Sequence, residues 1–301
     1  MVERLDVRFA GDGQVELAGW LYLPRSRERP LPAITMANGF GMTRLHGVEP
    51  FAEAFARAGF AVLLHDHRNF GESGGNERYD IDPWQQVADW RFAISYLENH
   101  DEINPDRIGI WGADLAGGHA LVLAASDRRV RAVVAQVPTI SGFEQARRRI
   151  PADALEALEA SFEDDDRRRF LTEEPLFQRI VSADPRLIAA FGAPDAVAFY
   201  ERECPAGTWE NRITVRSVRA TQLYEPGAWV ARVAPTPLMM VVARNDTVTM
   251  TDLTLAAYGR ALEPKRLVLT EGGHFAAFGK ERATASVAAA ERWFREHLKE
   301  G

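Results

Sequence analysis

Hydrophobic residues follow two different patterns along this chain. Residues 5 to 23 alternate polar and apolar positions around Gly11-Asp12-Gly13, which predicts a hairpin at the edge of a sheet. After about residue 30, short runs that are apolar throughout alternate with segments of helical periodicity. Strands that are apolar on both faces belong to parallel sheets covered by helices on each side. The predicted strands are 33–37, 61–64, 107–111, 132–137, 237–243 and 266–270, and the predicted helices are 48–58, 83–98, one that starts after residue 114, 251–262 and 284–298.

This alternation stops at residue 141 and resumes at residue 234. The interval is much longer than an ordinary connection, and it is rich in helix formers and aromatic residues. We therefore expect a doubly wound, mostly parallel α/β sheet formed by residues 1–140 and 234–301. Residues 141–233 are expected to form a helical lid, inserted between the sixth and seventh main strands. Ligands of such sheets bind at the carboxyl ends of the strands, which would lie below the insertion.

Asp114 is the strongest candidate for chemistry. It follows the apolar run Ile108-Gly-Ile-Trp-Gly-Ala and precedes Leu-Ala-Gly-Gly-His119. A strand, a turn with small residues and a helix in this order form a nucleophile elbow, G-x-S-x-G, with aspartate in the serine position. The helix that starts there favours a negative charge at its N-terminus. We therefore interpret Asp114 as a nucleophile rather than a neutral acid.

Two further candidates follow later strands in the order that this architecture requires. Asp246 comes after the predicted strand 237–243, and His274 comes after the predicted strand 266–270. A nucleophile, an orienting acid and a histidine base at three strand ends predict a catalytic triad. Phe40 and Leu115 are placed to donate the backbone N–H groups of an oxyanion hole.

These motifs resemble those of the α/β-hydrolase superfamily, which implies an α/β-hydrolase fold over nearly the whole chain. Segments 37–41, 65–75 and 111–119 are similar to bacterial esterases and peptidases of the dienelactone-hydrolase-like and X-Pro-peptidase-like groups. Those proteins carry serine at the position of Asp114 and often histidine at that of Asn38, so the chain departs from them at both. An aspartate nucleophile resembles the epoxide hydrolases and dehalogenases, although the residues around Phe40 and Leu115 differ from their usual motifs.

The resemblance to the aspartate enzymes implies a division of labour. Asp114 would attack an epoxide or a carbon–halogen bond and form an ester intermediate, His274 would activate the water that hydrolyses it, and Asp246 would orient the histidine. One alternative is an esterase whose serine has been replaced, naturally or by engineering. Another is a lyase, isomerase or cyclase that uses Asp114 as a base. A non-catalytic binding protein is disfavoured because the acid and the histidine are both present.

The expected substrate pocket combines one residue after the first parallel strand with aromatic residues of the insertion. Tyrosine hydroxyls there could open an epoxide, and tryptophan N–H groups could bind a halide, although ordinary packing would also account for these rings. No cofactor is expected, and His65, His67 and His119 lack the spacing of a metal site. The candidate pocket residues are Asn38, Tyr200, Trp209, Tyr224 and Trp229.

Composition and charge limit the possible partners. The net charge of −7 argues against a nucleic-acid surface, and the short arginine clusters at 147–149 and 167–169 are interpreted as solvated helix faces. There is no apolar signal region and no run of the roughly 18 apolar residues that span a bilayer. We therefore expect a cytoplasmic protein, not bound to a membrane, that acts on a small molecule. The sequence leaves open whether it forms homo-oligomers. The single cysteine, Cys204, is interpreted as a packing residue.

Overall fold

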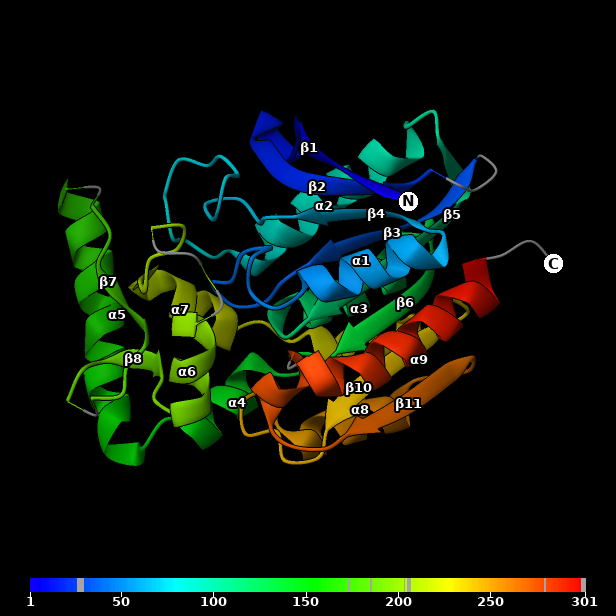
Figure 1. Cartoon of the computed structure of the whole chain (residues 1–301). Helices are drawn as coiled ribbons and strands as arrows, with labels where there is room; N and C mark the ends of the chain where they lie inside the picture. The colour runs from blue at the N-terminus through cyan, green and yellow to red at the C-terminus, as the bar shows by residue number, and fades with distance from the viewer. Residues whose placement is uncertain are drawn as a thin grey trace.

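A mostly parallel sheet forms the centre of the molecule (Figure 1). The structure is a computed structural model of the chain, and it describes residues 1–25, 30–172, 174–184, 186–202, 204, 207–278 and 280–298. Eight strands are hydrogen bonded in the order β1-β2-β4-β3-β5-β6-β10-β11. Their bounds are β1 (Val2–Ala10), β2 (Glu16–Pro24), β3 (Leu31–Ala37), β4 (Ala61–His65), β5 (Ile103–Ala113), β6 (Val130–Gln136), β10 (Leu238–Ala243) and β11 (Lys265–Thr270).

The pairing of these strands confirms the predicted mostly parallel α/β sheet. β1 and β2 form the predicted antiparallel hairpin, and β2 runs antiparallel to β4. All pairs from β4 to β11 along the sheet are parallel. Every residue of β4 and β10 is buried, as expected for strands that helices cover on both faces.

Helices cover the two faces of the sheet (Figure 1). α1 packs against α9 on one face, and α2 packs against α3 on the other. Local sequence explains several of their ends. The side chain of Asp82 accepts hydrogen bonds from the first turn of α2, and α1 ends at Gly59, whose φ of 106° suits glycine. These helices are α1 (Glu49–Ala58), α2 (Pro83–Glu98), α3 (Leu115–Ser126), α8 (Thr251–Arg260) and α9 (Lys280–Leu298).

The chain between β6 and β10 contains helices and a second small sheet, part of which forms the lobe on the left of Figure 1. The expected helical insertion thus contains short strands as well as helices. β7 pairs with β8 and with β9, so three short strands form a sheet in the order β8-β7-β9. A lid function for this segment stays a prediction. Its elements are α4 (Gly142–Arg149), α5 (Ala152–Thr172), β7 (Phe177–Val181), β8 (Ala189–Phe191), α6 (Pro194–Arg202), β9 (Ile213–Thr214), α7 (Val215–Gln222) and η2 (Pro226–Arg232).

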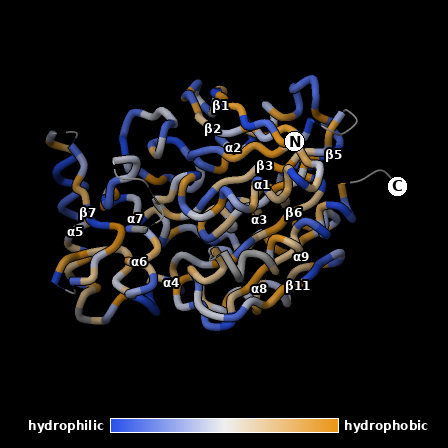
Figure 2. The backbone as a smooth tube through the Cα atoms, in the orientation of Figure 1, coloured by the Kyte–Doolittle hydropathy of each residue, from blue (hydrophilic) through white to orange (hydrophobic). Residues whose placement is uncertain are grey.

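Apolar residues concentrate along the central strands, while many peripheral turns are hydrophilic (Figure 2). The largest fully buried side chains include Trp90, Trp111 and Phe294, which lie in elements of the main sheet and its covering helices. In the part of the chain that the structure describes, none of the helices combines the length and apolar character needed to cross a lipid bilayer.

Candidate active site

Asp114 occupies a sharp turn between β5 and α3. Its φ of 52° and ψ of −120° are uncommon for a residue with a side chain, and such backbone strain is often found at functional sites. Backbone hydrogen bonds to the segment after β6 hold the turn. The N–H of Asp114 donates to Gln136 O at 3.0 Å, and the C=O of Asp114 accepts from Thr139 N–H at 2.9 Å. A Cβ atom at Gly112 would overlap the carbonyl group of Ala116. The glycine is therefore required where the helix turns back over the strand.

The carboxylate of Asp114 is buried and has two different environments. Its Oδ2 accepts a hydrogen bond from the backbone N–H of Phe40 at 2.8 Å, and its Oδ1 lies 3.8 Å from His274 Nε2. Gly39 lies so close to this carboxylate that a Cβ atom there would overlap it. Leu115, the other predicted oxyanion donor, is the first residue of α3 and lines the same cavity as Asp114.

Asp246 and His274 form a buried pair behind Asp114. His274 Nδ1 lies 2.9 Å from Asp246 Oδ2, which also accepts from the hydroxyl of Thr249 at 2.9 Å. The other oxygen, Oδ1, accepts from the N–H groups of Val248 and Thr249, both at 2.8 Å. This arrangement favours a proton on Nδ1 and leaves Nε2 facing Asp114. Nε2 has no hydrogen-bond partner among the described residues.

The two members of this pair shift each other's pKa in opposite directions. Burial alone raises the pKa of Asp246, but the neighbouring His274 and the N–H donors outweigh it and hold the pKa below its ordinary value. Burial lowers the pKa of His274, but the charge and hydrogen bond of Asp246 outweigh this effect and raise it above its ordinary value. The pair is therefore suited to holding a proton on the histidine.

Asn38 shapes the loop that carries Phe40 rather than a pocket wall. Its side-chain amide donates to Thr43 O at 3.0 Å and to His46 O at 2.8 Å. Its side-chain oxygen accepts from Gly39 N–H at 2.9 Å. All these bonds close the loop on itself, and Asn38 does not line the cavity beside Asp114, so its predicted place in the substrate pocket stays a prediction.

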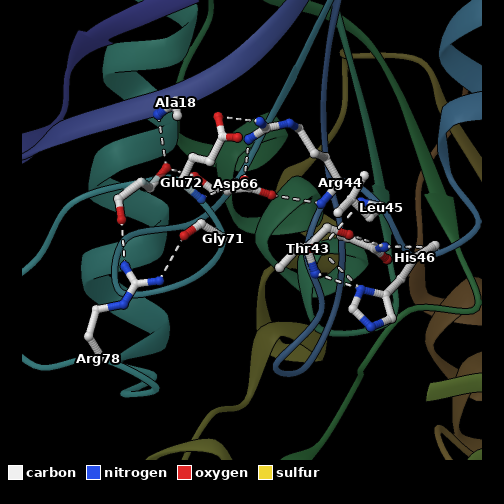
Figure 3. Close-up of polar contacts among 11 residues, drawn as sticks. Ala18, Thr43, Arg44, Leu45, His46, Asp66, Gly71, Glu72 and Arg78 are labelled. Atoms are coloured by element: carbon white, nitrogen blue, oxygen red, sulfur yellow. Dashed lines mark hydrogen bonds and ion pairs between the residues drawn. The ribbon is translucent and has the colours of Figure 1, made fainter. Parts of the chain in front are cut away.

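A buried ion-pair network ties the same loop to the turn after β4 (Figure 3). Arg44 donates from its backbone N–H to Asp66 Oδ1 at 2.7 Å, and its guanidinium pairs with Asp66 and, at 2.7 Å, with Glu72. The guanidinium also stacks on the ring of Trp20. The hydroxyl of Ser73 accepts from the backbone of β2 and donates to Asp66 O, so Ser73 has a structural part in this network. The position of Phe40 is thus fixed by two neighbouring segments.

Next to Asp114 lies a cavity of about 510 Å³ between the main sheet and the insertion. Phe40, Asp114, Leu115 and Val248 of the sheet domain contribute to its floor, and α4, α5, β8 and α7 supply most of the other lining residues. Much of that lining is apolar, which suits a hydrophobic organic ligand. Its larger apolar side chains from the insertion include Ile150, Leu158, Leu187, Ile188, Phe191 and Val218.

Arg149 adds a positive charge to the lining of this cavity. The prediction that Arg147, Arg148 and Arg149 form one solvated face holds for the first two, which are exposed, but was wrong for Arg149. Ala146, three positions earlier on the same helix, is buried, and residues three apart share a helix face. That spacing was the available sequence signal for the cavity position of Arg149.

Tyr200 and Trp209 hold the Phe40 loop from outside the cavity. The hydroxyl of Tyr200 donates to Phe40 O at 2.7 Å, and Trp209 Nε1 donates to Gly41 O at 2.9 Å. Neither side chain lines the cavity beside Asp114. Both point their polar atoms at the loop backbone, and their predicted place in the substrate pocket stays a prediction.

Tyr224 and Trp229 also lie away from that cavity. The hydroxyl of Tyr224 is 2.9 Å from His119 Nδ1, and both Tyr224 and Trp229 pack edgewise on Trp84 of α2. Their place in the substrate pocket stays a prediction as well. No group of three or more His, Cys, Asp or Glu side chains within the described residues is arranged to hold a metal ion.

Residues 12–276 match the family model of the X-Pro dipeptidyl-peptidase (S15) family. The chain is 34% identical to the quorum-quenching protein AidA of Acinetobacter baumannii, in an alignment that covers 83% of this chain and 81% of that protein. It is 31% identical to the polyketide transferase grgF of a Penicillium species, over 90% of this chain and 89% of that protein.

The crystal structure of the α/β hydrolase GrgF from Penicillium sp. sh18 has the same fold. Its TM-score against this chain is 0.84 at 28% identity, and the superposition covers 98% of this chain and 99% of GrgF. The names of these relatives are quorum-quenching protein, polyketide transferase and α/β hydrolase, and none of these names is that of an epoxide hydrolase or a dehalogenase.

Proposed function

The chain belongs to the X-Pro dipeptidyl-peptidase (S15) family and is a hydrolase of the α/β-hydrolase type, and we propose that Asp114 is its nucleophile. One observation carries this proposal. Asp114 Oδ2 accepts the N–H of Phe40, while Oδ1 faces His274 Nε2 beside a largely apolar cavity. Oδ1 is thus the oxygen placed to attack. Oδ2 is the oxygen on which negative charge would develop when the ester intermediate is hydrolysed.

Two steps complete the proposed reaction. First, Asp114 Oδ1 attacks an electrophilic carbon, so that a carbon–oxygen ester bond forms and the leaving group departs with its electron pair. Second, His274 Nε2 takes a proton from water, and the resulting hydroxide attacks Cγ of Asp114. The tetrahedral intermediate carries its negative charge on Oδ2, where the Phe40 N–H stabilises it. Its collapse breaks the Cγ–Oδ1 bond and releases the product as an alcohol that carries the former Oδ1 and receives the proton from His274. The oxygen of water stays in Asp114, whose new carboxyl group loses its proton to solvent and becomes a carboxylate again.

A saturated carbon is the electrophile that this geometry favours, as in an epoxide or a carbon–halogen bond. A serine esterase uses the N–H donors of the oxyanion hole to bind the acyl oxygen of its substrate. Here the Phe40 N–H already binds an oxygen of Asp114 itself. An acyl substrate would have to compete with a carboxylate for that donor.

An acyl-group reaction is the second candidate, and the relatives favour it. The relatives similar to this chain include a polyketide transferase and a quorum-quenching protein, and neither is named as an enzyme with an aspartate nucleophile. In this case the pocket is that of an ester or thioester hydrolase or transferase in which Asp114 replaces serine. A lyase, isomerase or cyclase with Asp114 as a base would use the same carboxylate without a covalent step.

Isotope labelling separates these candidates. A single turnover in ¹⁸O-water, with excess enzyme and a panel of epoxides, haloalkanes and p-nitrophenyl esters, is expected to place one ¹⁸O in the peptide that contains Asp114. Mass spectrometry of that peptide detects the label, and the Asp114→Asn variant serves as the unlabelled control. Product formed by the wild-type protein without label in Asp114 would exclude the covalent step and favour the base or acyl reactions.

A further inference from the structure

Arg149 is the last residue of α4 and shares the cavity with Asp114. Its side chain is half-buried, and its Nε atom is buried without a hydrogen-bond partner. Arg148 next to it is exposed and pairs with Asp252 at 2.7 Å. The two neighbouring arginines therefore have different environments, and Arg149 is the one that faces the ligand space.

The guanidinium of Arg149 forms no hydrogen bond or ion pair with the described residues. Two other charged residues line the same cavity, Asp184 and Arg186, but they pair with each other at 2.7 Å. A partly buried cation without a counter-ion is costly, because it loses hydration that nothing in the protein replaces. Burial accordingly lowers the pKa of Arg149 below its ordinary value.

Contacts with aromatic rings connect Arg149 to the loop beside the carboxylate of Asp114. Arg149 Cζ lies 4.8 Å from the ring centroid of Phe191, and Phe191 packs edgewise on Phe40 at 5.5 Å. Phe40 in turn donates its N–H to Asp114. The negative charge of Asp114 acts on Arg149, yet no ion pair joins them. Two opposite charges thus line one cavity without forming an ion pair with each other.

We infer that Arg149 binds a carboxylate group of the substrate, so that the ligand is a hydrophobic organic acid. The planar guanidinium offers a pair of parallel N–H donors that matches a carboxylate, and the apolar lining accommodates the hydrocarbon part. A phosphate fits less well, because its second negative charge would have no partner in a cavity with one unpaired cation. The inference rests on the proposed function in one respect, namely that the reacting carbon lies at Asp114 while the carboxylate lies at Arg149.

Ligand binding tests this inference without turnover. Octanoate and octanamide have nearly the same shape and differ in charge, and their affinities are measured by calorimetry on the Asp114→Asn variant, which lacks the repelling carboxylate. Octanoate is expected to bind about 10- to 100-fold more tightly than octanamide. Adding Arg149→Gln is expected to abolish this preference, whereas adding Arg148→Gln is expected to preserve it.

Thermal melting gives a second readout that shows whether the variant folds. Arg149→Met removes an unpaired cation from a half-buried site, so its Tm is expected to equal or exceed that of the wild-type protein. A folded Arg149→Gln protein that still prefers octanoate would overturn the inference. So would an Asp114→Asn protein that binds both ligands equally.

The outcomes separate this inference from the proposed function. If Asp114 takes up no ¹⁸O but Arg149 still controls the preference for octanoate, the nucleophile proposal fails and the carboxylate site stands. If Asp114 is labelled and the preference is absent, the reverse holds. An Arg149 that only balances the charge of Asp114 would favour octanoate in the Asp114→Asn background, where that charge is missing, but not in the wild-type protein, so a preference that persists in the wild-type protein excludes this role.

Discussion

At the scale of single residues, an aspartate in the elbow changes the use of the Phe40 N–H. A serine hydroxyl would leave this donor free for an acyl oxygen of the substrate, but Asp114 Oδ2 occupies it at 2.8 Å. The rest of the arrangement, with His274 paired to Asp246 at 2.9 Å, would serve either nucleophile. The side chain at position 114 therefore decides which class of electrophile can reach the donor.

Asp114→Ser is expected to create esterase activity on p-nitrophenyl butyrate that the parent protein lacks. The shorter side chain frees the Phe40 N–H for the acyl oxygen, and His274 then activates the hydroxyl. Release of p-nitrophenolate measures the activity. Asp114→Ala, which also frees the donor but supplies no nucleophile, is the matched control and is expected to be inactive. Equal rates for the two variants would show that the pocket does not support acyl transfer.

The pH dependence of turnover is expected to follow His274. Water activation needs neutral His274, and its pKa is raised above the ordinary 6.5 by Asp246. The rate of hydrolysis of the intermediate should therefore rise with pH through a value above 6.5. Asp246→Asn removes the negative charge, so the rising limb should move to lower pH while the maximal rate falls. A profile whose limb does not move in Asp246→Asn would contradict this role.

At the scale of elements, sequence patterns located the strands because each buried strand is a continuous apolar run. The same reasoning placed Asp114, Asp246 and His274, since each of them directly follows such a strand and parallel strands end at one edge of the sheet. The small sheet of the insertion had no comparable signal. Residue Phe177 of β7 pairs with Thr214 of β9, and strands of five and two residues so far apart in sequence are too short to show a clear periodicity.

The residues that line the pocket were harder to predict than the residues at strand ends. Whether a residue of the insertion lines the pocket depends on the direction of its side chain. Tyr200 and Trp209 lie near the site, yet each directs its polar atom to the backbone of the Phe40 loop. Arg149 was grouped with exposed neighbours, although one helical step of about 100° separates the faces of adjacent residues. Only the packing of α4 on the core determines which arginine faces the cavity.

The Arg44 network that joins the Phe40 loop to the turn after β4 is expected to contribute strongly to stability. Arg44→Met leaves Asp66 buried without its cation, and loss of one partner of a buried pair costs about 3–5 kcal/mol. Urea unfolding followed by circular dichroism measures the loss. Arg57→Met, which removes an exposed pair with Glu53, is the control and is expected to cost less than about 1 kcal/mol. Similar midpoints for both variants would show that the network is energetically unimportant.

At the scale of the whole molecule, the two parts of the chain supply different components of the site. The main sheet and its loops position Asp114, His274 and the Phe40 N–H, which act on the reacting atoms in the proposed reaction, and Asp246, which pairs with His274. Most of the remaining cavity lining, Arg149 included, comes from the insertion between β6 and β10. Changes in the insertion should therefore alter which ligand binds while leaving the chemistry of Asp114 intact.

Ligand length is the property that the insertion is expected to limit. Ala157 and Ala160 of α5 are both exposed, but only Ala157 lines the cavity. For 1-alkanols of increasing length, each buried CH₂ should add about 0.8 kcal/mol, roughly a fourfold gain in affinity, until the cavity is filled. Ala157→Trp occupies part of that space, so calorimetry should find that the gain ends at a shorter alcohol than in the wild-type protein. Ala160→Trp adds the same side chain outside the cavity and should leave the series unchanged. Identical series for all three proteins would place the ligand elsewhere than the cavity between the sheet and the insertion.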